Sequence, residues 1–261
     1  MTKEKIYYWP LWFSKLLSEA EQKKIKKIIP QLQRAQIYLW RALNIYDDFF
    51  DKEGKRLDLP QANTYFRKYL EIHYRLKLSN DYYMLLDKIF NKSDQANRNE
   101  ILTSNSKNLD CIADKSLTLA LGPLALLSYL NYKTTDKTFK AALNFFRYTL
   151  SAKQLSDDSH DWREDFDNGL TTYANEPIRR ALNKRKLSKK TKASSAIIDL
   201  IFVTDASPHI ITALTSLCLK ARKEMETINK NPKNIILQKL IKPIENACNK
   251  AHQFQLLICQ P

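Results

Sequence analysis

A chain of 261 residues with 44% apolar and 11% aromatic residues is long enough to bury a substantial core, and its composition is globular and not disordered. It contains only three glycines, which excludes a glycine-rich phosphate loop and argues against a β-rich fold with many tight turns. The formal net charge of +15 favours anionic partners: nucleic acid, an acidic membrane face or phosphorylated small molecules.

The cysteines predict a reducing compartment. None of the four shows Cys-x-x-Cys spacing, and all fall in apolar, helical contexts, as buried free thiols do. We find no apolar run after the first lysines that would indicate a signal peptide. No uninterrupted apolar run reaches the roughly 18 to 20 residues of a membrane span. These features predict a cytoplasmic protein.

The first third of the chain predicts helices that end in an acidic cluster. Residues 1–9 are basic and then aromatic, typical of a strap packed on helices or of a peripheral membrane contact. Apolar periodicity predicts a helix over Leu11–Ile29, ended by Pro30, and a second over Gln31–Phe50. The second helix carries three acids near its C-terminus: Asp47, Asp48 and Asp51. The helix dipole disfavours anions there, so these acids indicate a bound cation. The alternative is a solvated helix end.

The middle of the chain predicts further helices and one buried segment. Helices are expected over 61–77, 80–92 and 95–105, with a turn and cap at 91–94. Residues 109–132 are nearly all apolar, which predicts a helix buried on most sides and kinked at Gly122-Pro123. Lys115 lies next to this core and is either a phosphate ligand or the partner of a neighbouring aspartate.

A second acidic cluster lies about a hundred residues after the first. A long helix from Phe139 past Trp162 carries Asp157, Asp158, Asp161 and Asp165. Residues four apart lie one above another on a helix, so Asp157, Asp161 and Asp165 form a carboxylate stripe that Gln154 extends. Like charges at this spacing repel, and a bound cation removes that cost. Two such clusters predict two facing helices that hold divalent metal between them.

The last third predicts a basic loop at 183–192 and helices over 193–203, 208–228 and 233–255. Repeats and low-complexity linkers are absent. The predicted fold is therefore all-α, a single domain over residues 1–261.

Two acidic helices beside an apolar interior suit a substrate that carries diphosphate on a greasy tail. Mg²⁺ prefers oxygen ligands and is typically held by one or two carboxylates plus substrate phosphates. Mg²⁺ neutralises the diphosphate and makes it a leaving group. Aromatic faces in a dry cavity, such as those of Phe49 and Phe50, stabilise the carbocation that remains.

Three motifs resemble those of class I isoprenoid synthases. Tyr46-Asp47-Asp48-Phe49-Phe50-Asp51 resembles their first aspartate-rich motif, and Gln154 with Asp157-Asp158-x-x-Asp161 resembles the second motif of trans-prenyl diphosphate synthases. Between them, Lys115-Ser116 is similar to the Lys-Thr pair that those enzymes use on the diphosphate. The resemblance implies a helical bundle around a central cavity, an allylic prenyl diphosphate substrate and three Mg²⁺ ions, for which Mn²⁺ is a substitute. It also implies a homodimer.

The resemblance gives each residue an expected role. Asp47, Asp48 and Asp51 would hold one side of the metal cluster, and Asp157, Asp158 and Asp161 the other, with Asp165 as an auxiliary ligand. Five residues are expected to contact the diphosphate: Lys115, Gln154, Lys55, Arg56 and Arg179.

Departures from the family pattern leave alternatives open. The Gly-Gly-Lys-Arg segment that holds isopentenyl diphosphate is absent, and the double arginine after the first motif appears only as Lys55-Arg56. Asn168-Gly169 and Tyr173, in the tail of the second motif, are similar to squalene and phytoene synthases. We expect prenyl transfer, with terpene cyclisation or head-to-head coupling as the alternative. A basic helical protein that binds nucleic acid or membrane is the rival of another class, and it leaves the clustered aspartates unexplained.

Overall fold

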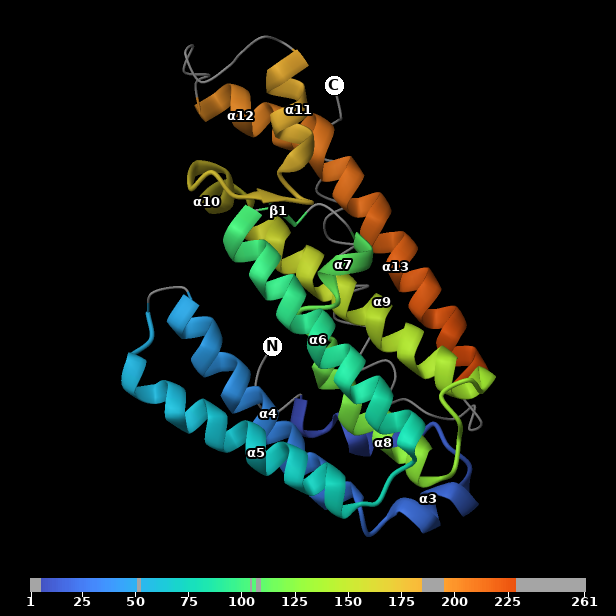
Figure 1. Ribbon diagram of the computed structural model, residues 1–261. Helices are drawn as coiled ribbons and strands as arrows, with labels where there is room; N and C mark the ends of the chain where they lie inside the picture. Colours follow the sequence, from blue (N-terminus) through green and yellow to red (C-terminus); the bar gives the residue numbers. More distant parts are fainter. Residues whose placement is uncertain (1–5, 51–52, 104, 107–108, 185–194, 229–261) are drawn as a thin grey trace. The chain divides into compact units, whose positions relative to one another are not determined.

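The computed structural model describes residues 6–50, 53–103, 105–106, 109–184 and 195–228. These residues are almost entirely helical, as the all-α prediction requires (Figure 1). In the described part, the only strands are the two-residue segments β1 (Asn105–Ser106) and β2 (Thr171–Thr172), which pair in parallel with Asn105 opposite Thr171.

The chain divides into two compact units, and each is described by itself. Unit 1 takes in the described residues of Met1–Phe90, Leu117–Leu143 and Glu224–Ile236. Unit 2 takes in those of Asn91–Ser116, Asn144–Lys223 and Leu237–Pro261. Three long helices contribute residues to both units: α6 (Asn80–Thr103), α9 (Lys137–His160) and α13 (Ser207–Ile228).

Unit 1 is built around a pair of long helices that lie side by side, α4 and α5 (Figure 1). Its helices are α2 (Trp9–Ser14), α3 (Glu19–Ile25), α4 (Ile29–Phe50), η1 (Arg56–Asp58), α5 (Leu59–Arg75), η2 (Leu117–Ala120) and α8 (Leu121–Tyr129). α8 is buried along almost its whole length and packs against α2 and α4. At the contact with α4, the amide of Gln36 donates a hydrogen bond to the Leu119 carbonyl at 2.7 Å. A Cβ on Gly122 would lie 2.9 Å from Gln36 Cδ, so a larger residue at this position would have to displace the Gln36 side chain.

A buried histidine lies between two tyrosines in the core of unit 1. His73 Nδ1 is 2.9 Å from the Tyr82 hydroxyl oxygen. The Tyr82 hydroxyl donates a hydrogen bond to the Leu121 carbonyl at 2.9 Å. The Tyr69 ring packs on the His73 ring at 4.4 Å between centroids. Because Tyr82 has a single proton to donate, His73 carries its own proton on Nδ1. Burial lowers the pKa of His73 to about 3, so the ring is neutral at physiological pH.

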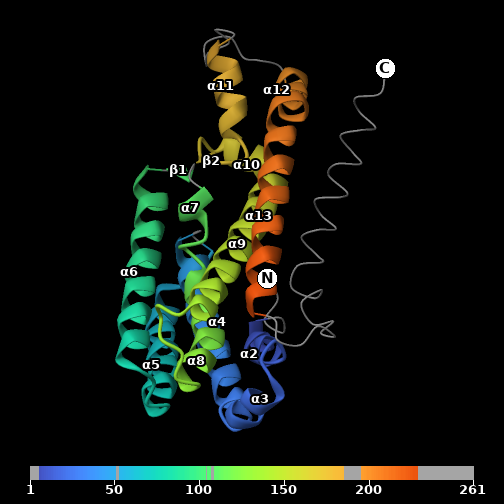
Figure 2. The ribbon, with the colours of Figure 1, turned by 90° about the vertical axis from the view of Figure 1, so that its right-hand side faces the viewer.

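Unit 2 packs its helices around one apolar cluster. Its shorter helices are α7 (Leu109–Ile112), α10 (Trp162–Asp167), α11 (Glu176–Lys184) and α12 (Ser195–Ile201). Leu155 of α9, Ile178 of α11 and Ile201 of α12 are fully buried in this cluster, together with one face of α13. The Trp162 ring stacks on Phe202 with 4.0 Å between centroids, which fastens α10 to the segment after α12. Figure 2 shows α9 and α13 side by side.

Several predicted helix boundaries are wrong. The expected helix over 11–29 is two helices, because Ser18 and Glu21 form a capping box that starts α3. The turn expected at 91–94 is absent: α6 continues through it, and Ser93 is buried with its hydroxyl bonded to the Lys115 carbonyl. The expected helix over 109–132 breaks into α7, η2 and α8, so Gly122-Pro123 lies in the first turn of α8 and not at a kink.

One continuous helix of 34 residues, Ser195–Ile228, replaces the two helices expected over 193–203 and 208–228. α12 passes through the π-helical turn η3 (Phe202–Ala206) directly into α13. By length and mean hydropathy, 1.5, this is the one helix in the described part that could cross a membrane, although core helices of soluble proteins pass the same test. A third of its most apolar stretch is buried in the protein. The sequence prediction divided the segment in two and therefore missed its length. The expected basic loop, for residues 185–192, and the last helix lie outside the described residues.

Candidate functional site

The first aspartate motif lies in the last turn of α4, in unit 1. The side chains of Asp47 and Asp48 are exposed, while Asp51 lies outside the described residues. The Asp48 carbonyl accepts hydrogen bonds from the backbone N–H groups of Glu53 and Gly54, at 2.9 and 2.7 Å. These two bonds satisfy a carbonyl that the helix end would otherwise leave unpaired. The acidic side chains are therefore held at the surface by an ordered helix end.

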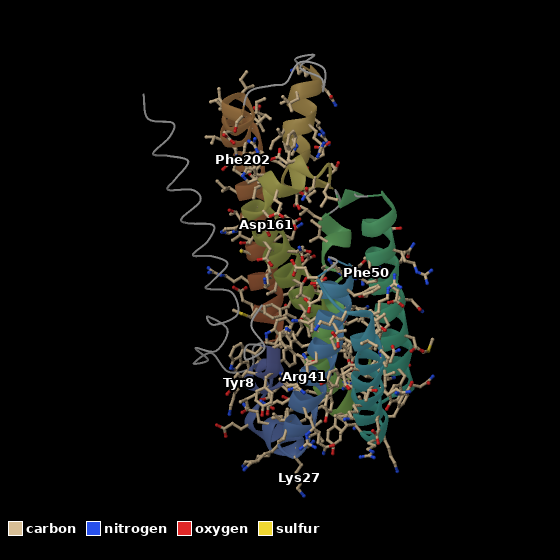
Figure 3. The ribbon with its side chains drawn as sticks, turned by 90° about the vertical axis from the view of Figure 1, so that its left-hand side faces the viewer. Tyr8, Lys27, Arg41, Phe50, Asp161 and Phe202 are labelled. Carbon is tan, nitrogen blue, oxygen red and sulfur yellow. The ribbon has the colours of Figure 1, made fainter. Side chains whose placement is uncertain are left out.

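A row of aromatic rings runs from the first motif into the core of unit 1. Phe50, which is 48% exposed, contacts Phe49 at 5.9 Å and Tyr46 at 6.4 Å between ring centroids. Tyr46 contacts Phe66 at 5.8 Å, and Phe66 contacts Phe90 at 6.0 Å. Figure 3 shows Phe50 at the end of α4. The row thus connects an exposed ring beside the first pair of aspartates to half-buried rings of unit 1.

The second aspartate motif lies in the last turn of α9, in unit 2. Gln154 Nε2 donates a hydrogen bond to Asp158 Oδ1 at 2.9 Å, and Lys153 forms an ion pair with Asp157. α9 ends at His160, and Asp161 is the N-cap position of α10 (Figure 3). The backbone N–H of Asp161 still bonds to the Asp157 carbonyl at 3.2 Å, so the chain keeps nearly helical spacing through the motif.

The two motifs occupy the same position on their helices. α4 ends at Phe50, three residues after Asp47, and α9 ends at His160, three residues after Asp157. In each case the third aspartate of the motif is the next residue in the sequence, Asp51 or Asp161. Each unit therefore presents an Asp-Asp pair at the end of a long helix, where the helix dipole disfavours negative charge.

The carboxylates of the described residues do not form a ready-made metal cage. In the ranges that the structure describes, no group of three His, Cys, Asp or Glu side chains lies close enough to hold an ion. Asp158 and Asp165 are half-buried, and Asp157 and Asp161 are exposed. One or two of these carboxylates suffice for Mg²⁺ only when phosphate oxygens and water complete its coordination.

The residues predicted to bind diphosphate differ in exposure and in the partners they contact. Lys55 and Arg56 are exposed beside the first motif, Arg56 in the turn η1. Lys115 is half-buried between α7 and η2, and its carbonyl accepts the Ser93 hydroxyl at 2.9 Å. Gln154 is bonded to Asp158, as described above.

Arg179 is engaged with the backbone. Its guanidinium donates to the Phe166 carbonyl at 3.2 Å and to the Leu170 carbonyl at 2.7 Å, and it lies over the Phe166 ring. Partial burial lowers the pKa of Arg179 from its ordinary value. These contacts fasten the turn after α10 to α11, which gives Arg179 a structural role that its sequence position did not reveal.

A cavity in unit 2 was not foreseen from the sequence. It has a volume of about 390 Å³ and lies between α9, α13 and the turn after β2. Its cationic and aromatic lining comes from Arg147, Tyr148, Tyr173, His209 and Lys220. Arg147 and Ser151 precede Gln154 by seven and three residues and so share its face of α9. That spacing was the signal which could have located the cavity.

Neither a family model, nor a curated protein, nor a solved structure matches this chain.

Proposed function

We propose that the protein is a class I isoprenoid synthase that ionises an allylic prenyl diphosphate and transfers the prenyl group. The observation that carries the proposal is the equal placement of the two Asp-Asp pairs, each in the last turn of a long helix. Helix ends tolerate anions poorly, so two identical placements favour a positively charged ligand at each pair over chance. The all-α fold is compatible with the proposal.

Magnesium is the cofactor that these donors fit. Asp47, Asp48, Asp157, Asp158 and Asp161 offer carboxylate oxygens, with Asp51 and Asp165 beside them. Since no three carboxylates of the described residues form a cage, the fit is to an ion that takes its remaining ligands from phosphate and water. When bound, Mg²⁺ supplies the Lewis acidity that turns diphosphate into a leaving group.

The chain's own residues would bind and orient the substrate. Lys55 and Arg56 are exposed next to the first motif and are free to approach a diphosphate by rotating their long side chains. Gln154 holds the Asp158 carboxylate in one orientation. The aromatic row from Phe50 inward offers the apolar, electron-rich faces that a prenyl chain and its cation need.

The decisive experiment is a product assay with purified protein, Mg²⁺ and geranyl, farnesyl or geranylgeranyl diphosphate, with and without isopentenyl diphosphate. A longer diphosphate made only with isopentenyl diphosphate establishes an elongating prenyltransferase. A hydrocarbon or alcohol with free diphosphate, made from the allylic substrate alone, establishes cyclisation or head-to-head coupling instead.

Matched variants tie turnover to the motifs. Asp48→Asn and Asp158→Asn should remove turnover, whereas Asp58→Asn and Asp167→Asn remove the same charge from exposed aspartates outside the motifs. If neither motif variant changes turnover, the proposal fails. Absence of turnover by the unmodified protein, together with absence of a melting-temperature shift by millimolar Mg²⁺ and prenyl diphosphate, would also overturn it.

A further inference from the structure

The cavity of unit 2 combines a buried floor with a cationic rim. Ser151, Ala213 and Leu217 are buried at its floor. Arg147, Tyr148 and Tyr173 form half-buried walls, and the rim is exposed and includes Lys220. None of the described residues that line it is acidic. A volume of about 390 Å³ falls in the range of small-molecule pockets.

Arg147 has hydrogen-bonding capacity that the protein does not use. Its Nε–H is buried and has no hydrogen-bond partner. Its terminal nitrogen lies 3.6 Å from Asp114 Oδ1, beyond normal hydrogen-bond length, and Asp114 is shared with Lys92 at 3.8 Å. The Asp114 carboxylate therefore neutralises this guanidinium without a close hydrogen bond, and Arg147 lines the cavity.

The second cation enters the cavity from α13. Lys220 Nζ lies 5.7 Å from the centre of the Tyr148 ring, so the tyrosine directs the ammonium group over the same cavity that Arg147 lines. Tyr173 and His209, which also line the cavity, stack with 4.7 Å between ring centroids. Two cations from different helices match the nearly double negative charge and three acceptor oxygens of a phosphate monoester better than the single charge of a carboxylate.

We infer that this cavity binds a small organic phosphate without metal. The phosphate lies between Arg147 and Lys220, and the organic part packs against Tyr148 and the Tyr173–His209 pair. The Ser216 hydroxyl at the rim supplies a further donor. The inference does not depend on the proposed synthase activity, because that activity uses the aspartates and Mg²⁺.

The test is calorimetric titration of the whole protein with phenyl phosphate in EDTA, at about 0.15 M salt so that non-specific attraction to the basic surface is screened. We expect saturable binding of one phenyl phosphate. Inorganic phosphate and phenol, which each carry half of the proposed recognition, should bind at least about tenfold more weakly.

Variants distinguish binding in the cavity from attraction to the basic surface and from binding at the aspartate motifs. Lys220→Met should weaken binding about tenfold or more, as loss of a charged hydrogen bond does. Lys223→Met removes the same charge from an exposed position of α13 outside the cavity and should leave binding unchanged. Arg147→Met should act like Lys220→Met, but it also leaves Asp114 with fewer partners, so the Lys220 variant decides the matter if the Arg147 variant does not fold.

Equal weakening by Lys220→Met and Lys223→Met would overturn the inference, because binding would then follow net charge. Equal affinities for phenyl phosphate and inorganic phosphate would show that the organic group adds nothing to binding, and would overturn the inference that the ligand is an organic phosphate. A requirement for Mg²⁺, with loss of binding in Asp158→Asn, would place the ligand at the aspartates and refute the cavity as its site. Binding in EDTA that Asp158→Asn leaves intact supports the cavity even if prenyl diphosphates are not turned over.

Discussion

Gln154 donates a hydrogen bond from Nε2 to Oδ1 of Asp158 at 2.9 Å, one turn further along α9. A residue that orients a ligating carboxylate commonly affects metal affinity or activity by about 10- to 100-fold when it is removed. We therefore expect Gln154→Leu to raise the Mg²⁺ concentration needed for half-maximal turnover about tenfold, because the Asp158 side chain loses its fixed orientation. The measurement is turnover of a prenyl diphosphate as a function of Mg²⁺.

The control for this variant is Arg163→Met, which breaks ion pairs with Asp167 and Asp199 in the same unit, neither of which is an aspartate of the motif. It should leave the Mg²⁺ dependence unchanged. An equal shift in both variants would show that Gln154 acts only through the stability of unit 2.

The second prediction concerns pH and follows from His73. Its pKa is about 3 in the folded protein, against about 6.5 in an unfolded chain. Between these values the unfolded chain binds a proton that the folded protein does not, so the contribution of His73 to stability is complete above pH 6.5 and falls as the pH drops toward 3. The slope approaches 1.4 kcal/mol per pH unit, an order-of-magnitude value.

Urea unfolding between pH 4 and pH 7 measures this slope. His73→Gln should be less stable at neutral pH, because it disturbs the contacts with Tyr69 and Tyr82, but its stability should depend less on pH. His209→Gln, in which an exposed ring is replaced, should keep the full slope. An unchanged slope in His73→Gln would show that other groups cause the pH dependence.

The third prediction tests the close packing of α8 on α4. A Cβ at position 122 would lie 2.9 Å from both Cδ and Oε1 of Gln36, so Gly122→Ala should destabilise the protein by about 1–3 kcal/mol through overpacking. The free energy of unfolding in denaturant measures it. In a Gln36→Ala background the same change should cost less, because the clashing atoms are gone. Additive costs would mean that the two side chains do not meet.

The fourth prediction concerns Arg179, whose guanidinium donates to the carbonyls of Phe166 and Leu170. Arg179→Met leaves both acceptors without this partner and should lower stability by roughly 1–3 kcal/mol. Lys should restore only part of the loss, since it lacks the planar guanidinium that lies over the Phe166 ring. Thermal unfolding measures both variants. If Arg179→Met melts normally but needs more prenyl diphosphate for half-maximal turnover, Arg179 binds substrate as its sequence position first indicated.

The sequence predicted elements best where the signal is local. The apolar period before the first motif placed the second helix at 31–50, and α4 covers Ile29–Phe50. The pattern Ser18-x-x-Glu21 was also readable as a helix start, and the capping box it forms explains why α3 is separate from α2. Predictions failed where contacts between residues far apart in the sequence decide the local structure. Asn91 and Ser93 indicated a turn, yet Ser93 bonds to the carbonyl of Lys115 and α6 continues.

In the candidate site, too, local sequence signals were more informative than contacts between distant residues. The first Asp-Asp pair was correctly predicted near the end of a helix. The second was predicted inside a helix that continues past Trp162, which is wrong, because α9 ends at His160 and α10 begins at Trp162. The acceptors of Arg179 could not be predicted, because the carbonyls of Phe166 and Leu170 are brought to it by a turn whose geometry the sequence does not encode in any one residue. The cavity was missed because Arg147 and Lys220 are 73 positions apart in the sequence and line one cavity only when α9 and α13 pack together.

The π-helical turn η3 has a consequence for how this segment tolerates insertions and deletions. Pro208 has no N–H to donate to the Thr204 carbonyl, and the helix passes this point with a wider turn that holds one surplus residue. Removing one residue from Phe202–Ala206 would tighten the turn and rotate the preceding helix by about 100° about its axis. Phe202 would then turn away from Trp162, and Ile201 would leave the apolar cluster. The spacing between the two halves of this helix is therefore fixed to the single residue.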